Sequence, residues 1–171
     1  MFEVIIIIAI VLAVAIAVIL ILAATKPSEF RIERSAPIDA PAERIFAVLS
    51  DFHQWTHWSP WEHRDPNLKR SFEGAERGKG AVYGWEGNKN VGSGRMEILE
   101  ANAPSKLRIK LDFFTPFEAH NTAEFTLLPQ GSGTNVHWLM RGPAPFMSKV
   151  MQVFMNFDKM IGKGFETGLA S

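Results

Sequence analysis

The sequence contains no cysteine. Disulfide bridges and cysteine nucleophiles are therefore excluded, and the redox state of the compartment leaves no mark on the chain. A glycine-rich phosphate-binding loop, a Gly-x-Ser-x-Gly nucleophile elbow, internal repeats and low-complexity segments are also missing. We therefore expect neither nucleotide-dependent nor covalent chemistry, and no cofactor.

An excess of positive charge is missing as well. The chain has 18 Lys+Arg and 18 Asp+Glu, and since Glu3 lies before a long apolar segment, the rest of the chain balances to 18 − 17 = +1. Nucleic-acid-binding domains carry basic patches, and no block of basic residues occurs here. A nucleic-acid partner is not expected.

The most prominent feature is the apolar segment Val4–Ala24, which consists only of Val, Ile, Leu and Ala. At about 1.5 Å per residue a helix of this length spans roughly 30 Å, which matches the hydrocarbon core of a bilayer. A helix buried in a soluble core normally keeps a polar face, and this segment has none. The segment predicts a single-pass membrane protein with a transmembrane helix at residues 1–25, a linker at 26–29 and one folded domain at 30–171.

A cleaved signal peptide is the main alternative to an anchor. Against it, no basic residue precedes the apolar run, the run exceeds the usual 7–15 residues, and cleavage after Ala24 would place Leu22 at the minus-three position. Lys26, Arg31 and Arg34 follow the run, so the positive-inside rule places the domain on the cytoplasmic side of an inner (cytoplasmic) membrane. Small residues at four-residue spacing allow two transmembrane helices to approach closely. A homodimer contact is therefore predicted at Ala9, Ala13 and Ala17.

The domain reads as an α+β structure. One strand begins at Phe30, two short helices follow around residues 41–58, and alternating apolar residues then predict six strands: 69–73, 81–86, 93–101, 107–113, 118–128 and 134–140. Pro143 and Pro145 end the last strand. Apolar residues at three- and four-residue steps then predict one long amphipathic helix from about Phe146 to the end. Within this helix Gly162, Gly164 and Gly168 either permit close approach to the sheet or loosen the helix.

Several motifs carry a family resemblance. They are Arg34-Ser35-Ala36-Pro37-Ile38-Asp39-Ala40-Pro41, Ile45-Phe46 with Leu49 and Asp51, Trp55, Trp58-Ser59-Pro60-Trp61, Tyr83-Gly84-Trp85-Glu86-Gly87-Asn88, Gly92-Ser93-Gly94-Arg95-Met96 and Phe165-Glu166-Thr167-Gly168-Leu169. With these the chain resembles the START/birch-pollen-allergen-like helix-grip superfamily (SRPBCC), in its polyketide cyclase/dehydrase-like branch. The resemblance implies a helix-grip fold, with a curved antiparallel sheet of about seven strands around a long C-terminal helix. No catalytic motif can be carried over.

Aromatic and methionine side chains are the best candidates for a ligand site. An apolar wall with few polar groups is typical of a small-molecule pocket, and thioethers repack readily around varied ligands. The alternative for each residue is an ordinary core position. The predicted cavity lining comprises Trp55, Trp58, Trp61, Tyr83, Trp85, Phe113, Phe117, Trp138, Met151 and Phe154.

Other polar residues permit different chemistry. His53, His57 and His63 suggest a metal site, but no acidic residue or Cys has ligand-like spacing, so no metal is predicted. An enzyme would need an acid or base in the cavity, and the eligible strand residues are Arg95, Asp112, His120, Glu124 and His137. The cluster of His120, Glu124 and His137 faces either a pocket or solvent.

Three functions follow from these patterns. The leading hypothesis is a membrane-anchored protein that binds a hydrophobic small molecule, such as a lipid, isoprenoid, quinone or polyketide-like compound, between sheet and C-terminal helix. The alternatives are a cyclase- or dehydrase-type enzyme that uses the same cavity, and a membrane-tethered protein-interaction module. A cavity of several hundred Å³ with almost no ionisable groups would favour binding.

Overall fold

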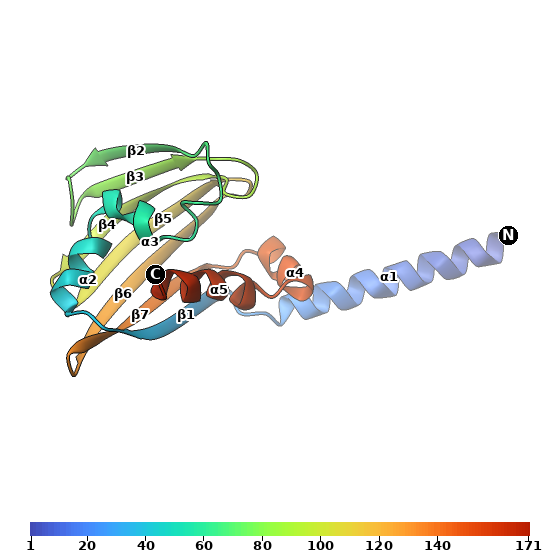
Figure 1. The fold of residues 1–171 in the computed structure, drawn as a ribbon. Coiled ribbons are helices and arrows are strands. Elements are labelled where there is room, and N and C mark those ends of the chain that lie inside the picture. Colours follow the sequence, from blue (N-terminus) through green and yellow to red (C-terminus); the bar gives the residue numbers. More distant parts are fainter. The chain divides into compact units, whose positions relative to one another are not determined.

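A computed structural model describes residues 1–171. The chain contains one long helix, seven strands and several shorter helices (Figure 1). In order these are α1 (Phe2–Ala24), β1 (Glu29–Ile38), α2 (Ala42–Leu49), η1 (Phe52–Gln54), α3 (Trp55–Trp58), β2 (Lys69–Gly74), β3 (Ala81–Glu86), β4 (Ser93–Asn102), β5 (Lys106–Thr115), β6 (Ala119–Gln130), β7 (Gly133–Pro143), α4 (Phe146–Phe154) and α5 (Phe157–Leu169).

The seven strands form one antiparallel sheet in the order β1-β7-β6-β5-β4-β3-β2. Successive strands from β2 to β7 pair as hairpins, and β1 pairs with β7 and forms one edge of the sheet. The alternation of side chains is clear in β6 and β7, where every second residue is buried. All seven predicted strands are confirmed. In β6 and β7 the alternation results from burying one face of the sheet, whereas β2 is exposed along its whole length.

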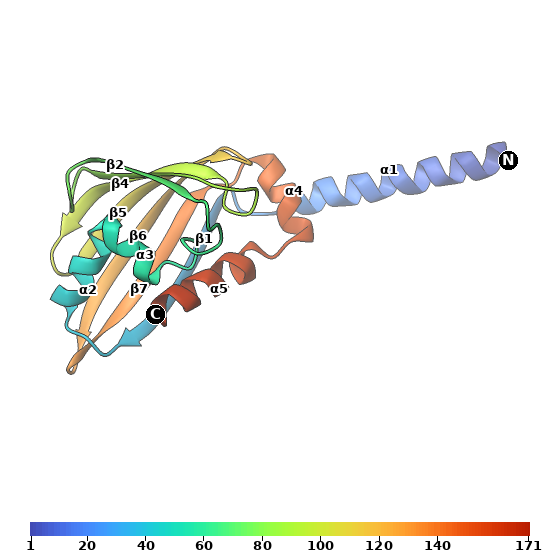
Figure 2. The same ribbon diagram turned by 45° about the horizontal axis from the view of Figure 1, so that its top comes forward.

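The chain divides into two compact units. One consists of residues 31–142 and 158–171 and holds most of the sheet with α2, η1, α3 and α5; the other consists of residues 1–30 and 143–157 and holds α1 and α4. In the first unit α2, α3 and α5 lie over the same face of the sheet (Figure 2). This arrangement confirms the predicted α+β helix-grip fold.

Residues at the N-cap positions determine where the short helices α2 and η1 begin. Pro41 keeps an extended ψ and stands at the N-cap, so α2 begins one residue later, at Ala42. Asp51 caps η1 by accepting a hydrogen bond from the backbone N–H of His53 at 3.0 Å. The Trp55 indole N–H donates to the carbonyl of Leu49 and ties the end of α2 to the next turn.

The prediction of one continuous C-terminal helix was wrong. The chain forms two helices, α4 and α5, because Met155 adopts an extended conformation with φ −125° and ψ 135°. The two helices belong to different units, and Asn156, which directly precedes α5, is a residue type that favours the N-cap position. Periodicity alone did not reveal the break, since Phe154 and Phe157 keep the three-residue step across it.

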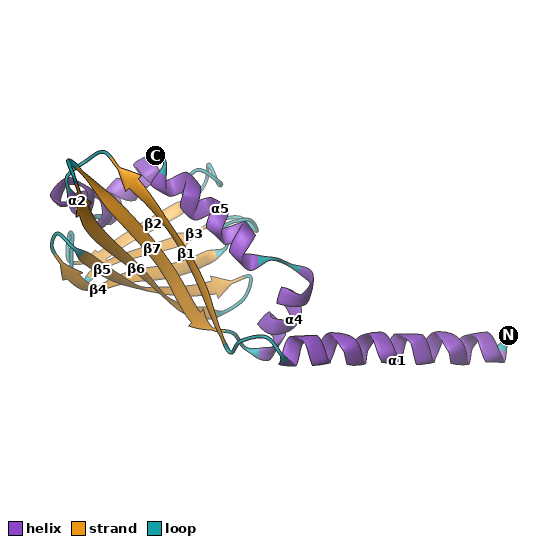
Figure 3. Cartoon of the chain, turned by 90° about the horizontal axis from the view of Figure 1, so that it is seen from below, coloured by secondary structure: helices purple, strands orange, loops and turns teal.

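In the other unit, α1 packs against α4 (Figure 3). Ala23 is the only buried residue of α1, Ile19 is half-buried, and the other residues of the helix are exposed. By length and composition α1 is the one helix that could cross a membrane, although a signal sequence near an N-terminus would pass the same test. The backbone N–H of Ala144 donates to the carbonyl of Ser28 at 2.8 Å, which joins the chain before α4 to the chain after α1.

Candidate functional site

Aromatic rings fill much of the space between the sheet and its covering helices. Trp138 on β7 stacks on Phe165 of α5, with ring centroids 4.1 Å apart and planes 3° apart. Trp58 and Trp61 each meet Trp138 edge to face, at 5.6 and 5.8 Å. Such arrangements add about 0.5–1.5 kcal/mol per pair beyond the apolar burial. α5 is thus attached to the sheet through a connected aromatic layer.

The same ring contacts continue toward β2. Trp55 contacts Trp58 and Phe52, Phe52 contacts Tyr83, and Tyr83 leads through Trp85 to Phe113. The structure therefore brings together seven of the ten predicted lining residues: Trp55, Trp58, Trp61, Tyr83, Trp85, Phe113 and Trp138. They pack mainly against one another, as a core does.

The other three predicted residues lie elsewhere. Phe117 follows β5 and is 66% exposed. Met151 and Phe154 lie on α4, in the unit that contains α1, and Phe154 is 69% exposed. The structure does not bring these three into the aromatic group.

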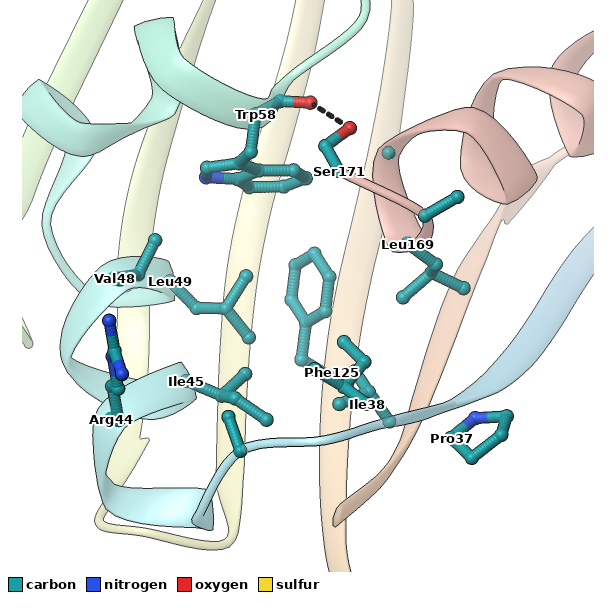
Figure 4. A pocket seen from close by; sticks show the side chains of 14 residues that line it. Pro37, Ile38, Arg44, Ile45, Val48, Leu49, Trp58, Phe125, Leu169 and Ser171 are labelled. Atoms are coloured by element: carbon teal, nitrogen blue, oxygen red, sulfur yellow. Dashed lines mark hydrogen bonds between the residues drawn. The ribbon is translucent and has the colours of Figure 1, made fainter. Parts of the chain in front are cut away.

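A pocket of about 390 Å³ lies beside this group, under α2 and the end of α5 (Figure 4). Its wall is mostly aliphatic, and among the ten predicted residues only Trp58 contributes to it. The lining residues are Pro37, Ile38, Ala40, Arg44, Ile45, Val48, Leu49, Trp58, Phe125, Val136, Gly168, Leu169, Ala170 and Ser171. The Ser171 hydroxyl donates to the carbonyl of Trp58 at 3.3 Å, which joins the end of the chain to the residue that ends α3 (Figure 4).

Sequence reasoning missed most of this wall. Ile45, Val48 and Leu49 lie on the short helix α2, which the sequence analysis predicted without assigning a face of it to a cavity. The same hydrophobic period describes a face that packs tightly and a face that borders a cavity. One sequence feature could have pointed to the pocket: the motif that carries the family resemblance includes Pro37, Ile38 and Ala40, and these residues line the pocket.

Two polar groups of the pocket have no partner in the protein. The Trp58 indole nitrogen is buried and makes no hydrogen bond, and Figure 4 shows it on the side of α2. Arg44 is exposed at the rim and pairs with no carboxylate. No side chain of the lining carries a carboxylate, an imidazole or a lysine ammonium. The pocket therefore offers an apolar volume, one buried hydrogen-bond donor and one cation.

Three glycines let α5 approach its neighbours closely. A Cβ at Gly164 would lie 2.7 Å from the Trp61 ring, and one at Gly168 would lie 3.2 Å from the Trp138 ring. A Cβ at Gly162 would overlap the guanidinium of Arg34. All three glycines are buried. Of the two alternatives considered for these glycines, close approach and a loosened helix, the structure shows close approach, and each glycine makes room for a specific side chain.

Arg34 on β1 holds the start of α5. Its Nε donates to Glu166 at 2.7 Å, and its two terminal nitrogens donate to the Asp158 carboxylate, each at 3.0 Å. Further bonds reach the carbonyls of Asp158 and Glu33. These contacts raise the pKa of Arg34 above its ordinary value and lower that of Asp158, in both cases mainly through the hydrogen bonds that join them.

A second polar cluster is fully paired. Glu62 is buried, and its carboxylate accepts from the Tyr83 hydroxyl at 2.6 Å and from Arg70 Nε at 2.7 Å. Burial, together with the hydrogen bond to Glu62, raises the pKa of Tyr83. Nearby, the Asp65 carboxylate accepts from the backbone N–H groups of Asn67 and Asn88. These groups satisfy one another and fix the chain between α3 and β2.

The candidate acids and bases of the strands face away from the pocket. Phe125 and Val136 line it, so their neighbours Glu124 and His137 point to the opposite face of the sheet. On that face Glu124 pairs with Lys106 and Arg141, and His137 with Glu33. Of the two placements considered for the His120, Glu124 and His137 cluster, the structure has the outer one.

Asp112 and His120 form a further pair on the outer face, 2.8 Å apart. Burial raises the pKa of Asp112, but hydrogen bonds from Lys110 and His120 outweigh it and bring the pKa below its ordinary value. The hydrogen bond to Asp112 in turn raises the pKa of His120. The fifth eligible residue, Arg95, pairs with Glu97 two residues along β4.

The three clustered histidines do not converge. His53 bonds to Asp51 and stacks on Phe72 with ring centroids 4.1 Å apart, whereas His57 contacts the carbonyl of Gln54. His63 is exposed. No group of three or more His, Cys, Asp or Glu side chains is placed to hold a metal ion.

Comparison with known proteins gives one family. A sequence model of the family described as polyketide cyclase / dehydrase and lipid transport matches residues 29–170, which is more than half of the chain. No curated protein matches the chain.

Solved structures of similar fold are numerous but distant in sequence. A Staphylococcus aureus protein of unknown function aligns with a TM-score of 0.62 at 12% identity, over 83% of this chain and 90% of that one. A Mesorhizobium loti protein aligns at 0.58 and 17% identity, over 82% and 95%. The structure of Ara h 8.0201 aligns at 0.53 and 14% identity, over 81% and 95%. At these identities the likeness establishes the fold alone.

Proposed function

The chain belongs to the polyketide cyclase / dehydrase and lipid transport family of the helix-grip (SRPBCC) superfamily, and we propose from this premise that it is a membrane-anchored binding protein for a hydrophobic small molecule. The ligand would occupy the pocket beneath α2 and the end of α5. The division into a transmembrane helix at 1–25, a linker at 26–29 and a binding domain at 30–171 is part of the proposal.

The pocket carries this proposal. Its volume of about 390 Å³ falls within the range of small-molecule sites, about 300–1,000 Å³. Its lining is aliphatic and aromatic apart from Arg44 and the Ser171 hydroxyl. Since general acid–base chemistry needs a titratable group within hydrogen-bond reach of the substrate, this lining supports binding rather than catalysis.

The two unpaired polar groups indicate the kind of ligand. A buried indole N–H without an acceptor costs free energy, and a ligand oxygen beside Trp58 would recover it. Arg44 at the rim favours an anionic or strongly polar head group. The ligand that fits has an apolar body and an oxygen-bearing end, as fatty acids, isoprenoid acids and quinones have.

The apolar helix supports the membrane part of the proposal. Only four residues separate the end of α1 at Ala24 from the start of β1 at Glu29, so the chain gives the binding domain a short tether. A tethered carrier can exchange its ligand with the bilayer. The cytoplasmic orientation and the contact between copies through Ala9, Ala13 and Ala17, which are exposed on α1, are further predictions.

Native mass spectrometry of the full-length protein, released from membranes in a mild detergent, tests the proposal. We expect one apolar molecule per chain, and tandem fragmentation and organic extraction would identify it. Val48→Trp fills the pocket from α2 and should remove the adduct. Ala47→Trp is the matched control, because Ala47 directly precedes Val48 on α2 but is exposed and does not line the pocket.

The control separates pocket binding from lipid that clings to α1. An adduct that survives equally in Val48→Trp would lie outside the pocket and would overturn the proposal. A chain that carries no adduct in any variant would do the same.

A further inference from the structure

The helix α4 exposes a set of large apolar side chains. Phe146, Met147 and Phe154 are 51%, 69% and 69% exposed, and Met155, which follows the helix, is 43% exposed. Isolated apolar side chains are common on protein surfaces, but four within ten residues of one short segment need an explanation. None of these side chains is required by the pocket.

This segment lies at the end of the apolar helix α1. α4 packs against α1, and the one buried residue of α1, Ala23, marks the C-terminal end of that helix. The Lys149 ammonium of α4 donates to the Ser28 hydroxyl at 3.0 Å, and the Ala144 N–H donates to the Ser28 carbonyl. The contact is therefore fixed by both packing and hydrogen bonds.

The length of α1 locates this contact relative to a bilayer. Twenty-three helical residues extend about 34 Å at about 1.5 Å each, slightly more than a hydrocarbon core of about 30 Å. If α1 spans, its last turn reaches the boundary between acyl chains and head groups. Thr25 and Lys26 then begin the polar side, and α4 lies beside that boundary.

The composition of α4 suits such a boundary. Residues 143–157 contain no Asp or Glu and one cation, Lys149, and a second cation, Lys26, belongs to the same unit. Helices that lie in the interface plane bury Phe, Leu and similar side chains about 5–10 Å deep and place Lys or Arg toward anionic head groups.

We propose that α4 is an interfacial membrane helix, and that Phe146, Met147, Phe154 and Met155 insert into the bilayer surface next to the end of α1. The proposal rests on the membrane anchoring of the proposed function. The break between α4 and α5 at Met155 separates a lipid-binding helix from a helix that covers the sheet.

A second copy of the chain fits this surface less well. A stable protein interface buries about 800 Å² per partner and uses about 20–30 residues on each side. The exposed apolar set consists of four side chains on a nine-residue helix and its following residue.

Spin labelling of the full-length chain in anionic lipid nanodiscs tests the proposal, and the absence of native cysteine makes each label unique. Labels would be placed at Met147→Cys and Phe154→Cys. Leu12→Cys reports on the middle of α1, and Ser132→Cys, in the exposed β6–β7 turn, reports on water. The accessibility of each label to oxygen and to a water-soluble nickel chelate gives its depth.

We expect label 12 in the acyl core, labels 147 and 154 near the head groups, and label 132 in water. Labels 147 and 154 in water with label 12 immersed would overturn the role of α4 but leave the anchor intact. Label 12 in water would overturn the anchor, and α4 with it. Spin–spin broadening at 154 that disappears on dilution with unlabelled chain would assign the surface to a second copy instead.

Discussion

At the residue scale, Gly162 shows how one missing side chain shapes the binding domain. A Cβ there would overlap the Arg34 guanidinium, which is held by Asp158 and Glu166. Gly162→Ala gains about 1 kcal/mol of helix propensity. It loses more, because overpacking costs about 1–3 kcal/mol and disturbing the ion pairs of Arg34 with two exposed carboxylates costs up to about 1 kcal/mol each. We expect a net destabilisation of about 1–3 kcal/mol, seen as a lower Tm in thermal unfolding followed by circular dichroism.

Lys163→Ala is the control for this prediction, since Lys163 is the next residue on α5 and is exposed. Its Tm should stay within the change expected of a neutral surface substitution, about 0.5 kcal/mol. A Gly162→Ala protein as stable as the Lys163→Ala protein would show that Arg34 moves aside without loss.

The binding-site residues were predictable only in part. The aromatic residues were chosen because large apolar side chains tend to be buried, and seven of the ten do meet in the core. Their density, however, makes them pack together rather than line a void. The pocket lies where aliphatic side chains of α2 and β1 leave a gap, and the size of a gap depends on the distance between elements, which no local pattern encodes. Trp58 belongs to both groups because it lies at their border.

At the element scale, the attachment of α5 to β1 should depend on pH. Hydrogen bonds from Arg34 hold the pKa of Asp158 below its ordinary value. A carboxyl with a lowered folded-state pKa contributes stability that is fully present above its unfolded pKa, about 3.9, and is lost as the pH falls through the folded value. We therefore expect the contact to weaken only below about pH 4.

Asp158→Asn tests this prediction. The variant should unfold at a lower temperature than the wild type at pH 6, and the difference should shrink as the pH is lowered from 4 to 3. Measuring the difference cancels the carboxyl groups that both proteins share. Glu43→Gln removes an exposed, unpaired carboxylate on α2 and should show no such convergence. A difference in Tm that stays constant down to pH 3 would contradict the assigned role of Asp158.

Elements were predicted more accurately than their partners. The strands follow from alternation, and the hairpin order β2 to β7 follows from short connections between neighbouring runs. The C-terminal segment failed because one amphipathic pattern served two helices with different partners. α4 packs on α1 whereas α5 packs on the sheet, and a period of 3.6 residues does not state which surface a helix covers.

At the scale of the whole molecule, the two units differ in how much apolar surface they expose to solvent. The sheet and α5 bury their apolar side chains against one another, whereas α1 leaves almost all of its apolar surface exposed. Each exposed CH₂ group opposes solution in water by about 0.8 kcal/mol, so α1 needs a bilayer, a partner helix or removal from the chain. In the proposed function, the bilayer covers the apolar surface of α1.

Arginine substitutions in α1 make that choice measurable. Its fifteen Val, Ile and Leu residues contribute about −0.3 to −0.6 kcal/mol each to insertion, roughly −7 kcal/mol together, whereas a central Arg costs about 2.5–3.5 kcal/mol. Leu12→Arg alone should therefore remain in the membrane after alkaline extraction. The triple variant Ile8→Arg/Leu12→Arg/Ile16→Arg exceeds the available insertion energy and should be released.

Intact mass should show residues 1–24 still attached to the wild-type chain; a mature chain without them would identify a signal peptide and rule out the anchor.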